Sequence, residues 1–124
     1  MEKVSKYRFS VDLKAKETSL TKIVELVGFN KNVLEVGCAT GYMSKVFKER
    51  GCRVVAVEIN RQAAAEAEKY CDRMIVGDVE FLDLKKELED EKFDVGVFSD
   101  ILEHLRDPRA TLLKVKDLLQ ENGY

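Results

Sequence analysis

Apolar residues follow two patterns along this chain, one typical of helices and one typical of buried strands. Leu20, Ile23, Val24 and Val27 recur at i, i+3, i+4 and i+7, which predicts an amphipathic helix that ends at Gly28. Short, nearly continuous apolar runs are instead typical of strands that are covered on both faces. Runs of this second kind predict four strands, at residues 33–36, 54–57, 74–76 and 93–98.

Helical segments with recognisable start signals separate these strands. They are predicted at residues 42–50, 60–71, 83–88 and 107–122, with Asn60, Asp83 and Asp107 as N-caps and Pro108 in the first turn of the last helix. The apolar positions predicted for that last helix are Leu112, Val115 and Leu119. Gly96, inside the fourth strand, predicts a close approach of another element on one face of the sheet.

The alternation of strands and helices determines the expected fold class. Strands joined through helices pair in parallel, and right-handed crossovers then cover both faces of the sheet. The sequence therefore predicts an α/β, Rossmann-like, doubly wound parallel sheet, in a single domain spanning residues 1–124. Residues 1–17 are expected to be a flexible N-terminal segment, or else to fold over a ligand with the aromatic residues of Tyr7-Arg8-Phe9.

Composition narrows the classes of partner. The formal net charge is −2 and mixes both signs, so no basic field favours nucleic acid or an anionic membrane surface. The three cysteines, Cys38, Cys52 and Cys71, form no C-x-x-C pair, and neither a disulfide framework nor a metal site is predicted. No long apolar stretch or signal peptide is evident, and a cytoplasmic location is expected.

The most informative segment is the junction between the first strand and the helix after it. The run Val33–Gly41 leaves a buried strand and enters a turn with small residues, and such a turn lets main-chain atoms approach a ligand at a helix N-terminus. A dinucleotide site would require G-x-G-x-x-G, but here Ala39 is in the second position and Tyr42 is in the third. The frame is instead E-x-G-x-[GA]-x-G.

This frame resembles the first signature of the class I S-adenosylmethionine-dependent methyltransferases, from whose commonest form Ala39 departs. The resemblance covers roughly Val33 to Gly123 and implies the strand order 3-2-1-4 for the four strands found. Because the family's sheet usually has seven strands, with a fifth beginning at about Tyr124, the chain is expected to be a truncated form of the fold.

Acidic residues at the ends of the next two strands fit the same ligand. Glu58, followed by Ile59, ends the second strand and can accept two hydrogen bonds from a ribose diol. Asp78 follows the third strand and can accept a hydrogen bond from an adenine amino group, while Val79 and Phe81 supply apolar contacts to the ring. In parallel sheets such strand ends gather in one crevice, which Ser99 and Asp100 also border.

Within the signature, the resemblance implies a role for each residue. Glu35 is expected to face the amino group of the methionine part directly or through water. Gly37, Ala39 and Gly41 are expected to offer mainly main-chain groups. Cys38 is expected to pack as a small apolar residue without a nucleophilic role.

His104 is the only histidine of the chain. In the segment Ser99–Leu105 it resembles the E-H-L stretch found after the fourth strand in small-molecule and quinone-type members of the family. The resemblance places His104, with Asp100, near the methyl acceptor as a general base. An alternative is that His104 orders the loop through Glu103 or Asp107.

These observations lead to the expectation of an S-adenosylmethionine-dependent enzyme that methylates a small-molecule acceptor. A non-catalytic adenosyl-binding or interaction module is the alternative, and a nicotinamide-binding domain is disfavoured by the glycine spacing. The strand at 93–98 is expected to leave an open, apolar edge, through which the chain would associate with itself.

Overall fold

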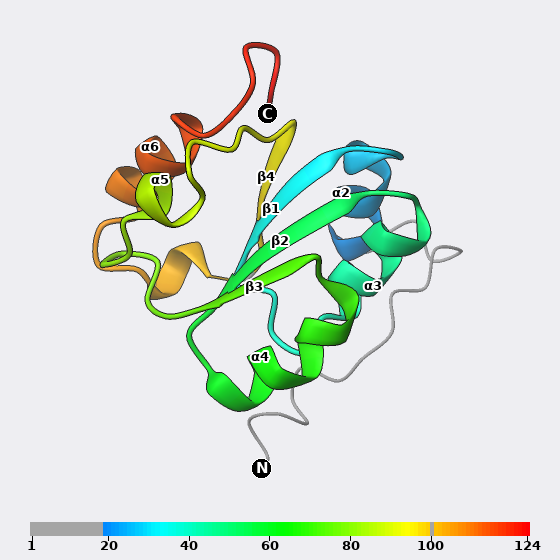
Figure 1. The fold of residues 1–124 in the computed structure, drawn as a ribbon, viewed down its shortest axis with the longest axis horizontal. Coiled ribbons are helices and arrows are strands. Elements are labelled where there is room, and N and C mark those ends of the chain that lie inside the picture. Colours follow the sequence, from blue (N-terminus) through cyan, green and yellow to red (C-terminus); the bar gives the residue numbers. More distant parts are fainter. Residues whose placement is uncertain (1–18, 100) are drawn as a thin grey trace.

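Four parallel strands form one sheet in the order β3-β2-β1-β4, and helices cover both of its faces (Figure 1). The computed structural model describes residues 19–99 and 101–124, so the predicted N-terminal segment 1–17 and Asp100 lie outside the described residues. The strands are β1 (Asn32–Val36), β2 (Arg53–Glu58), β3 (Arg73–Val76) and β4 (Val95–Phe98). The predicted fold class and strand order are confirmed.

The helices begin where the sequence predicts. They are α2 (Ser19–Val27), α3 (Tyr42–Glu49), α4 (Arg61–Ala67), α5 (Leu84–Glu87) and α6 (Pro108–Lys116), with the short 3₁₀ turns η1 (Glu68–Tyr70) and η2 (Leu102–His104). All three predicted N-caps are confirmed: the side chain of Asn60 accepts hydrogen bonds from two main-chain N–H groups of α4, and Asp83 and Asp107 each accept one. Gly28 follows α2 with φ +77°, a conformation that glycine adopts without strain.

Successive residues of each strand pack on opposite faces, which creates two main parts of the core. One face, with Leu34 and Val57 among its strand residues, packs against α5 and α6. The other, which includes Val33 and Val54, packs against α2 and α3. Gly96 makes the close contact predicted for it, because a Cβ atom there would lie 2.9 Å from Cγ1 of Val115 on α6.

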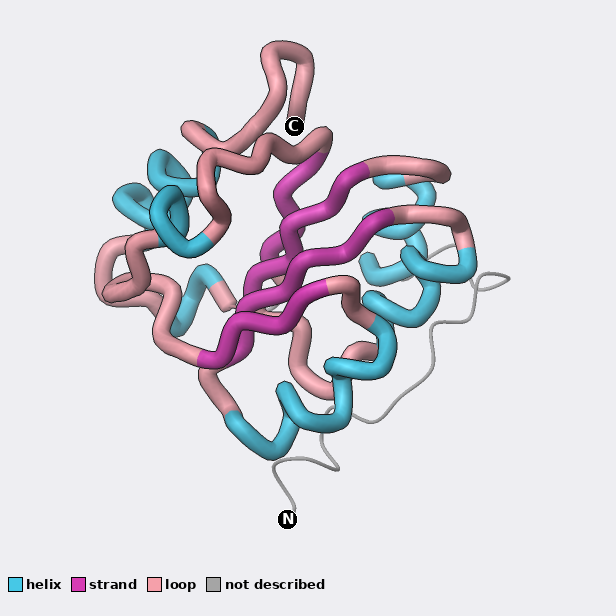
Figure 2. Tube along the Cα trace, viewed as in Figure 1, coloured by secondary structure: helices cyan, strands magenta, loops and turns pink. Residues whose placement is uncertain are grey.

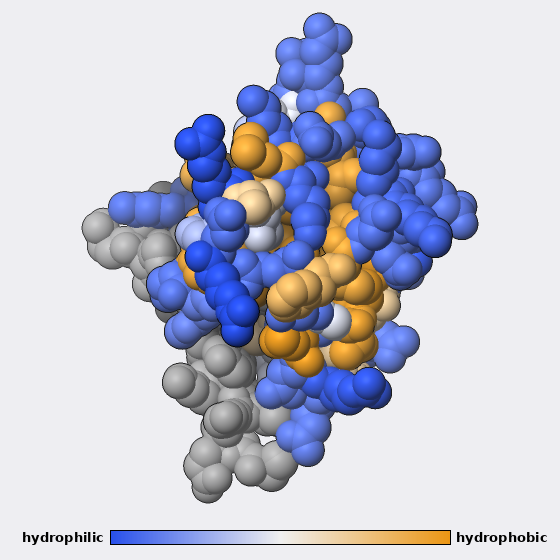
Figure 3. Space-filling view, turned by 90° about the vertical axis from the view of Figure 1, so that its left-hand side faces the viewer, coloured by the Kyte–Doolittle hydropathy of each residue, from blue (hydrophilic) through white to orange (hydrophobic). Residues whose placement is uncertain are grey.

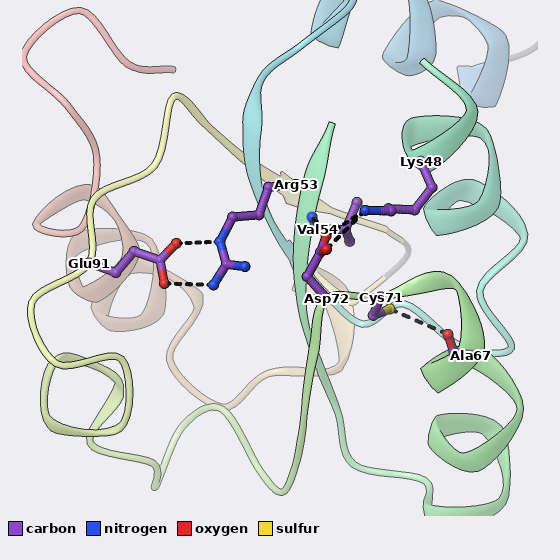
Figure 4. Close-up of polar contacts among 7 residues, drawn as sticks. All are labelled: Lys48, Arg53, Val54, Ala67, Cys71, Asp72 and Glu91. Atoms are coloured by element: carbon purple, nitrogen blue, oxygen red, sulfur yellow. Dashed lines mark hydrogen bonds and ion pairs between the residues drawn. The ribbon is translucent and has the colours of Figure 1, made fainter. Parts of the chain in front are cut away.

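Ion pairs join the elements around the amino end of β2 (Figure 4). Arg53 places Nε and one terminal nitrogen on the two carboxylate oxygens of Glu91, at 2.8 and 3.1 Å. Asp72 accepts two hydrogen bonds from Lys48, and its Oδ2 also accepts one from Val54 N at 2.7 Å. Because these groups are partly exposed, each pair contributes at most about 1 kcal/mol to stability.

The last helix is shorter than predicted, because α6 ends at Lys116 rather than at residue 122. Beyond it, main-chain groups pair with Phe93, which precedes β4, instead of continuing the helix: Phe93 N donates to Leu118 O at 2.8 Å, and Gln120 N donates to Phe93 O at 2.7 Å. The predicted stripe was also partly wrong, since Leu112 is 43% exposed. The end of the helix was predicted wrongly because main-chain pairing with a distant segment competes with local helical periodicity.

The edge of β4 is less open than predicted. Tyr124 N donates to Asp94 O at 3.0 Å, and Gly96 N donates to Tyr124 O at 2.7 Å, which is the pattern of a parallel bridge opposite Val95. Figure 2 shows this end of the chain beside the start of β4. A groove of about 190 Å³ remains between α2 and β4, bordered by Leu26 and Phe98.

Among the helices of the described residues, none is both long and apolar enough to cross a membrane.

Candidate functional site

The turn between β1 and α3 has an unusual backbone. Gly37, Ala39 and Gly41 all have positive φ angles, of +82°, +53° and +90°. Gly37 N donates to Val57 O at 2.8 Å, which ties the turn to the end of β2. A Cβ atom at Gly37 would lie 3.1 Å from Cβ of Ile101. Glycine at this position therefore allows the positive φ angle and the close packing of the turn against Ile101 and Ser99.

Glu58 is held in place by the main chain on both sides. It is only 8% exposed. Its Oε1 accepts a hydrogen bond from Ala39 N at 2.7 Å, and its Oε2 accepts one from Asn60 N at 3.0 Å. Because each carboxylate oxygen can accept two hydrogen bonds, each retains capacity for a further donor. Glu58 is thus a preorganised acceptor at the end of β2.

Two adjoining cavities lie at the carboxyl ends of the strands. The larger, of about 270 Å³, is lined by Gly37, Ala39, Tyr42, Glu58, Ile59, Ser99, Ile101 and His104. The smaller, of about 140 Å³, is lined by Val36, Val57, Ile59, Gly77, Asp78, Val79, Glu80, Ile101, His104 and Leu105. Ile59, Ile101 and His104 are common to both cavities. Figure 3 shows apolar residues gathered among hydrophilic ones on the face that it draws. The two cavities therefore adjoin and are together called the crevice, with Glu58 in the larger and Asp78 in the smaller.

Glu35 lies beneath the turn and does not line either cavity. It is 1% exposed, and its Oε1 accepts a hydrogen bond of 2.5 Å from Oγ of Ser44 on α3. Within the described part of the chain, its Oε2 is buried without a hydrogen-bond partner. Burial, reinforced by the nearby charge of Glu58 and opposed by the Ser44 hydrogen bond, raises the pKa of Glu35 to about 7.

Two further residues of the signature also face away from the crevice. Cys38 is buried against Ala56 and Ala67, as expected for a small apolar residue. Burial raises the pKa of its thiol far above the ordinary value, which leaves it protonated and unreactive. Gly41 approaches Ala67 so closely that a Cβ atom there would lie 2.9 Å from Ala67 Cα.

The predicted apolar and acceptor-side residues divide in the same way. Val79 and Ile59 line the crevice, but Phe81 is 78% exposed and lines neither cavity. His104 borders both cavities with an exposed side chain, and its Nε2 lies 3.6 Å from Oε1 of Glu103. Asp100 lies outside the described residues.

The sequence reasoning missed several residues of the crevice wall. Ile101 and Leu105 flank the 3₁₀ turn that carries His104 and line the smaller cavity beside it, and their apolar character next to the predicted acceptor-side histidine was the available signal. Tyr42, at the start of α3, borders the larger cavity. Its place directly after the glycine-rich turn was the available signal.

Comparisons with known proteins agree with this architecture. The family model described as a methyltransferase domain matches residues 13–124. The ubiquinone biosynthesis O-methyltransferase of Pasteurella multocida (strain Pm70) is 33% identical over 105 aligned positions, and the match covers 75% of this chain and 43% of that protein. The ubiquinone biosynthesis O-methyltransferase of Histophilus somni (strain 2336) is also 33% identical, over 75% of this chain and 42% of its own length.

Solved structures share the fold at lower identity. The N-terminal domain of EvdMO1 with SAH bound matches with a TM-score of 0.71 and 21% identity, over 91% of this chain and 48% of that one. The chain thus spans less than half the length of the curated relatives it matches. The match of the family model over nearly the whole sequence shows that this chain belongs to the methyltransferase domain family.

Proposed function

We propose that this chain is the cofactor-binding part of an S-adenosylmethionine-dependent methyltransferase that acts on an oxygen atom of a small-molecule acceptor. The observation that carries the proposal is the preorganised carboxylate of Glu58, which lines the larger cavity together with Gly37, in a chain of the methyltransferase domain family. The names of the relatives, which are O-methyltransferases, support oxygen as the acceptor atom.

The residues present fit this cofactor at three points. Gly37 lines the larger cavity without a side chain of its own, so main-chain groups can approach a ligand there. The remaining lone pairs of Glu58 suit the two hydroxyl groups of a ribose. The smaller cavity combines the acceptor Asp78 with mainly apolar walls, which suits a flat adenine ring.

Glu35 supplies the fourth point of the proposed fit. Its Oε2, which has no hydrogen-bond partner among the described residues, is a buried acceptor two residues before Gly37. A cationic amino group, or a water molecule bound to one, would satisfy this oxygen and favour the ionised carboxylate. Because Glu35 lines neither cavity, contact through water is the more natural arrangement.

The chemistry of transfer places few demands on the protein. Bound S-adenosylmethionine carries a methyl group on a positively charged sulfur, which makes that methyl carbon electrophilic. The chain's own contribution is to hold the ligand and to align an acceptor oxygen with it. His104, exposed at the mouth of both cavities, is positioned to accept the proton of an acceptor hydroxyl group, with Glu103 nearby to stabilise the imidazolium that forms.

The test is direct binding, measured by titration calorimetry with S-adenosylhomocysteine and, separately, with NAD. We expect saturable binding of the first and none of the second. Glu58→Gln should weaken binding by about 1.5–3 kcal/mol, because a charged acceptor is replaced by a neutral group with one acceptor oxygen.

A matched control separates this effect from loss of folding. Asp72→Asn also removes a carboxylate that accepts a main-chain N–H, but at the amino end of β2, away from both cavities. It should leave the affinity for S-adenosylhomocysteine within about twofold of the original value, because it touches neither cavity. Binding of NAD alone would refute the proposed function.

A further inference from the structure

A lysine of α6 contacts the main chain of the loop that borders the smaller cavity. Lys114 Nζ donates hydrogen bonds to the carbonyl oxygens of Val79 at 2.9 Å, Glu80 at 3.2 Å and Leu82 at 3.0 Å. An ammonium group has three donors at one point, so it can satisfy three converging carbonyl groups. A planar guanidinium cannot reproduce this geometry. Lys114 therefore fixes three carbonyl groups of a single loop.

The same loop is closed from its other side by Asp78. The carbonyl oxygen of Asp78 accepts hydrogen bonds from Phe81 N and Leu82 N, both at 3.0 Å, and its Oδ1 accepts one from Glu80 N at 2.9 Å. The amide groups of the loop thus bond to Asp78, while its carbonyl groups bond to Lys114. This division leaves the loop with one well-determined conformation.

Glu80 connects this loop to the segment that precedes α6. Its Oε1 accepts a hydrogen bond from Arg106 N at 3.2 Å, and its Oε2 accepts one from Asp107 N at 2.9 Å. His104 and Leu105, which border the smaller cavity, come directly before these two residues. The carboxylate of Glu80 therefore ties together two loops that line one cavity.

We propose that Lys114 and Glu80 are positioning residues that set the shape of the smaller cavity for the adenosyl part of the ligand. This inference rests on the proposed function for the identity of the ligand. Lys114 lines neither cavity and acts through the main chain of residues 79–82. Glu80 lines the smaller cavity and acts on its shape through residues 106 and 107. The three hydrogen bonds from Lys114 to the loop are called the clamp below. This positioning role also accounts for a lysine that bonds to three carbonyl groups rather than to a carboxylate.

The experiment compares Lys114→Met and Glu80→Gln with two matched controls. Lys92→Met removes a lysine that donates to a main-chain carbonyl, Asp117 O at 2.7 Å, but that lines neither cavity. Glu91→Gln removes a carboxylate that bridges two segments through Arg53, also away from the cavities. The four variants are measured at the same temperature after confirming that each unfolds cooperatively.

Two readouts are used. Calorimetry with S-adenosylhomocysteine and 5′-methylthioadenosine reports affinity for two probes that share the adenosyl group. Amide hydrogen exchange of the unliganded chain reports the loops directly, through the amides of residues 80–82, 106 and 107. A role in general stability alone would change exchange across the whole sheet and would not single out these five amides.

We expect Lys114→Met to weaken both probes at least about tenfold and by the same factor, because charge-assisted hydrogen bonds to the loop are lost. Exchange should accelerate at residues 80–82 in this variant and at residues 106 and 107 in Glu80→Gln. The controls should stay within about twofold of the original affinities.

Unchanged affinity in Lys114→Met, or an equal loss in Lys92→Met, would overturn the positioning role. If the unaltered chain binds neither probe, the proposed function fails and the exchange data decide the clamp alone. Retained protection in Lys114→Met would then overturn the clamp, whereas lost protection confined to residues 80–82 would support it for another ligand of the cavity.

Discussion

Replacing Glu35 by glutamine should raise the stability of the chain relative to the original protein, and this gain should be larger at pH 8 than at pH 4. The carboxyl group is buried beneath the glycine-rich turn, and only one of its oxygens has a partner among the described residues. Glutamine retains an oxygen for the Ser44 hydroxyl and has a similar volume, but it carries no charge. The variant therefore isolates the cost of ionising this one group.

The magnitude follows from the shift in pKa. Burial raises the pKa of Glu35 from its ordinary value of 4.5 to about 7 in the folded chain. At roughly 1.4 kcal/mol per pH unit, the free energy of unfolding falls by about 3 kcal/mol as the pH rises through this window. Below pH 4.5 the Glu35 carboxyl group is protonated in the folded and in the unfolded chain, so its contribution to the free energy of unfolding is fully present there. That contribution is lost as the pH rises through 7.

The assay is urea denaturation at pH 4, 5, 6, 7 and 8 for the original chain and for Glu35→Gln. All other titrating groups are common to both proteins and cancel in the difference. That difference should increase in favour of the variant by about 3 kcal/mol between pH 4 and pH 8.

A flat difference for Glu35→Gln would refute the reasoning. It would mean that a cation or water molecule compensates for the burial of the Glu35 carboxylate in solution, so that its pKa is not raised in the folded chain. A difference that grows toward low pH would contradict the sign itself.

Three shorter predictions concern the turn, the crevice and the sheet edge. In urea denaturation, Gly41→Ala should lose about 1–2 kcal/mol of stability because its backbone is left-handed, and about 1–3 kcal/mol more because the new Cβ clashes with Ala67. Gly28→Ala has nothing within 4 Å of its new Cβ, so it should lose only the about 1–2 kcal/mol that comes from the backbone. The imidazole NMR signal of His104, unique in this chain, should shift when S-adenosylhomocysteine is added, and an unmoved signal would remove His104 from the ligand site. The chain should associate with itself as its concentration rises, measured by light scattering, and Leu26→Lys in the groove beside β4 should reduce this association. A chain that stays monomeric at all concentrations would show that the segment after α6 already protects the edge of β4.

Local chemistry accounts for what could be predicted from the sequence. The caps at Asn60, Asp83 and Asp107 act on amide groups only two or three residues away, so their side chains determine where helices begin regardless of the rest of the fold. Alternation of strands with helices was sufficient for a parallel sheet, because few other topologies are compatible with it. The same reasoning gathered Glu58, Asp78 and the glycine-rich turn at one edge of the sheet.

Contacts between distant segments decided the rest. Periodicity alone extended the last helix to residue 122, but main-chain pairing of Leu118 with Phe93 ended it at Lys116, since a strand edge offers partners that no local pattern reveals. The clamp of Lys114 on a loop some 32–35 positions earlier was equally invisible in the sequence. The elements and the general position of the crevice were thus determined by the sequence through short-range capping and burial. The shape of the crevice, and the burial of Glu35 outside it, were decided by the tertiary structure through hydrogen bonds and packing between remote residues.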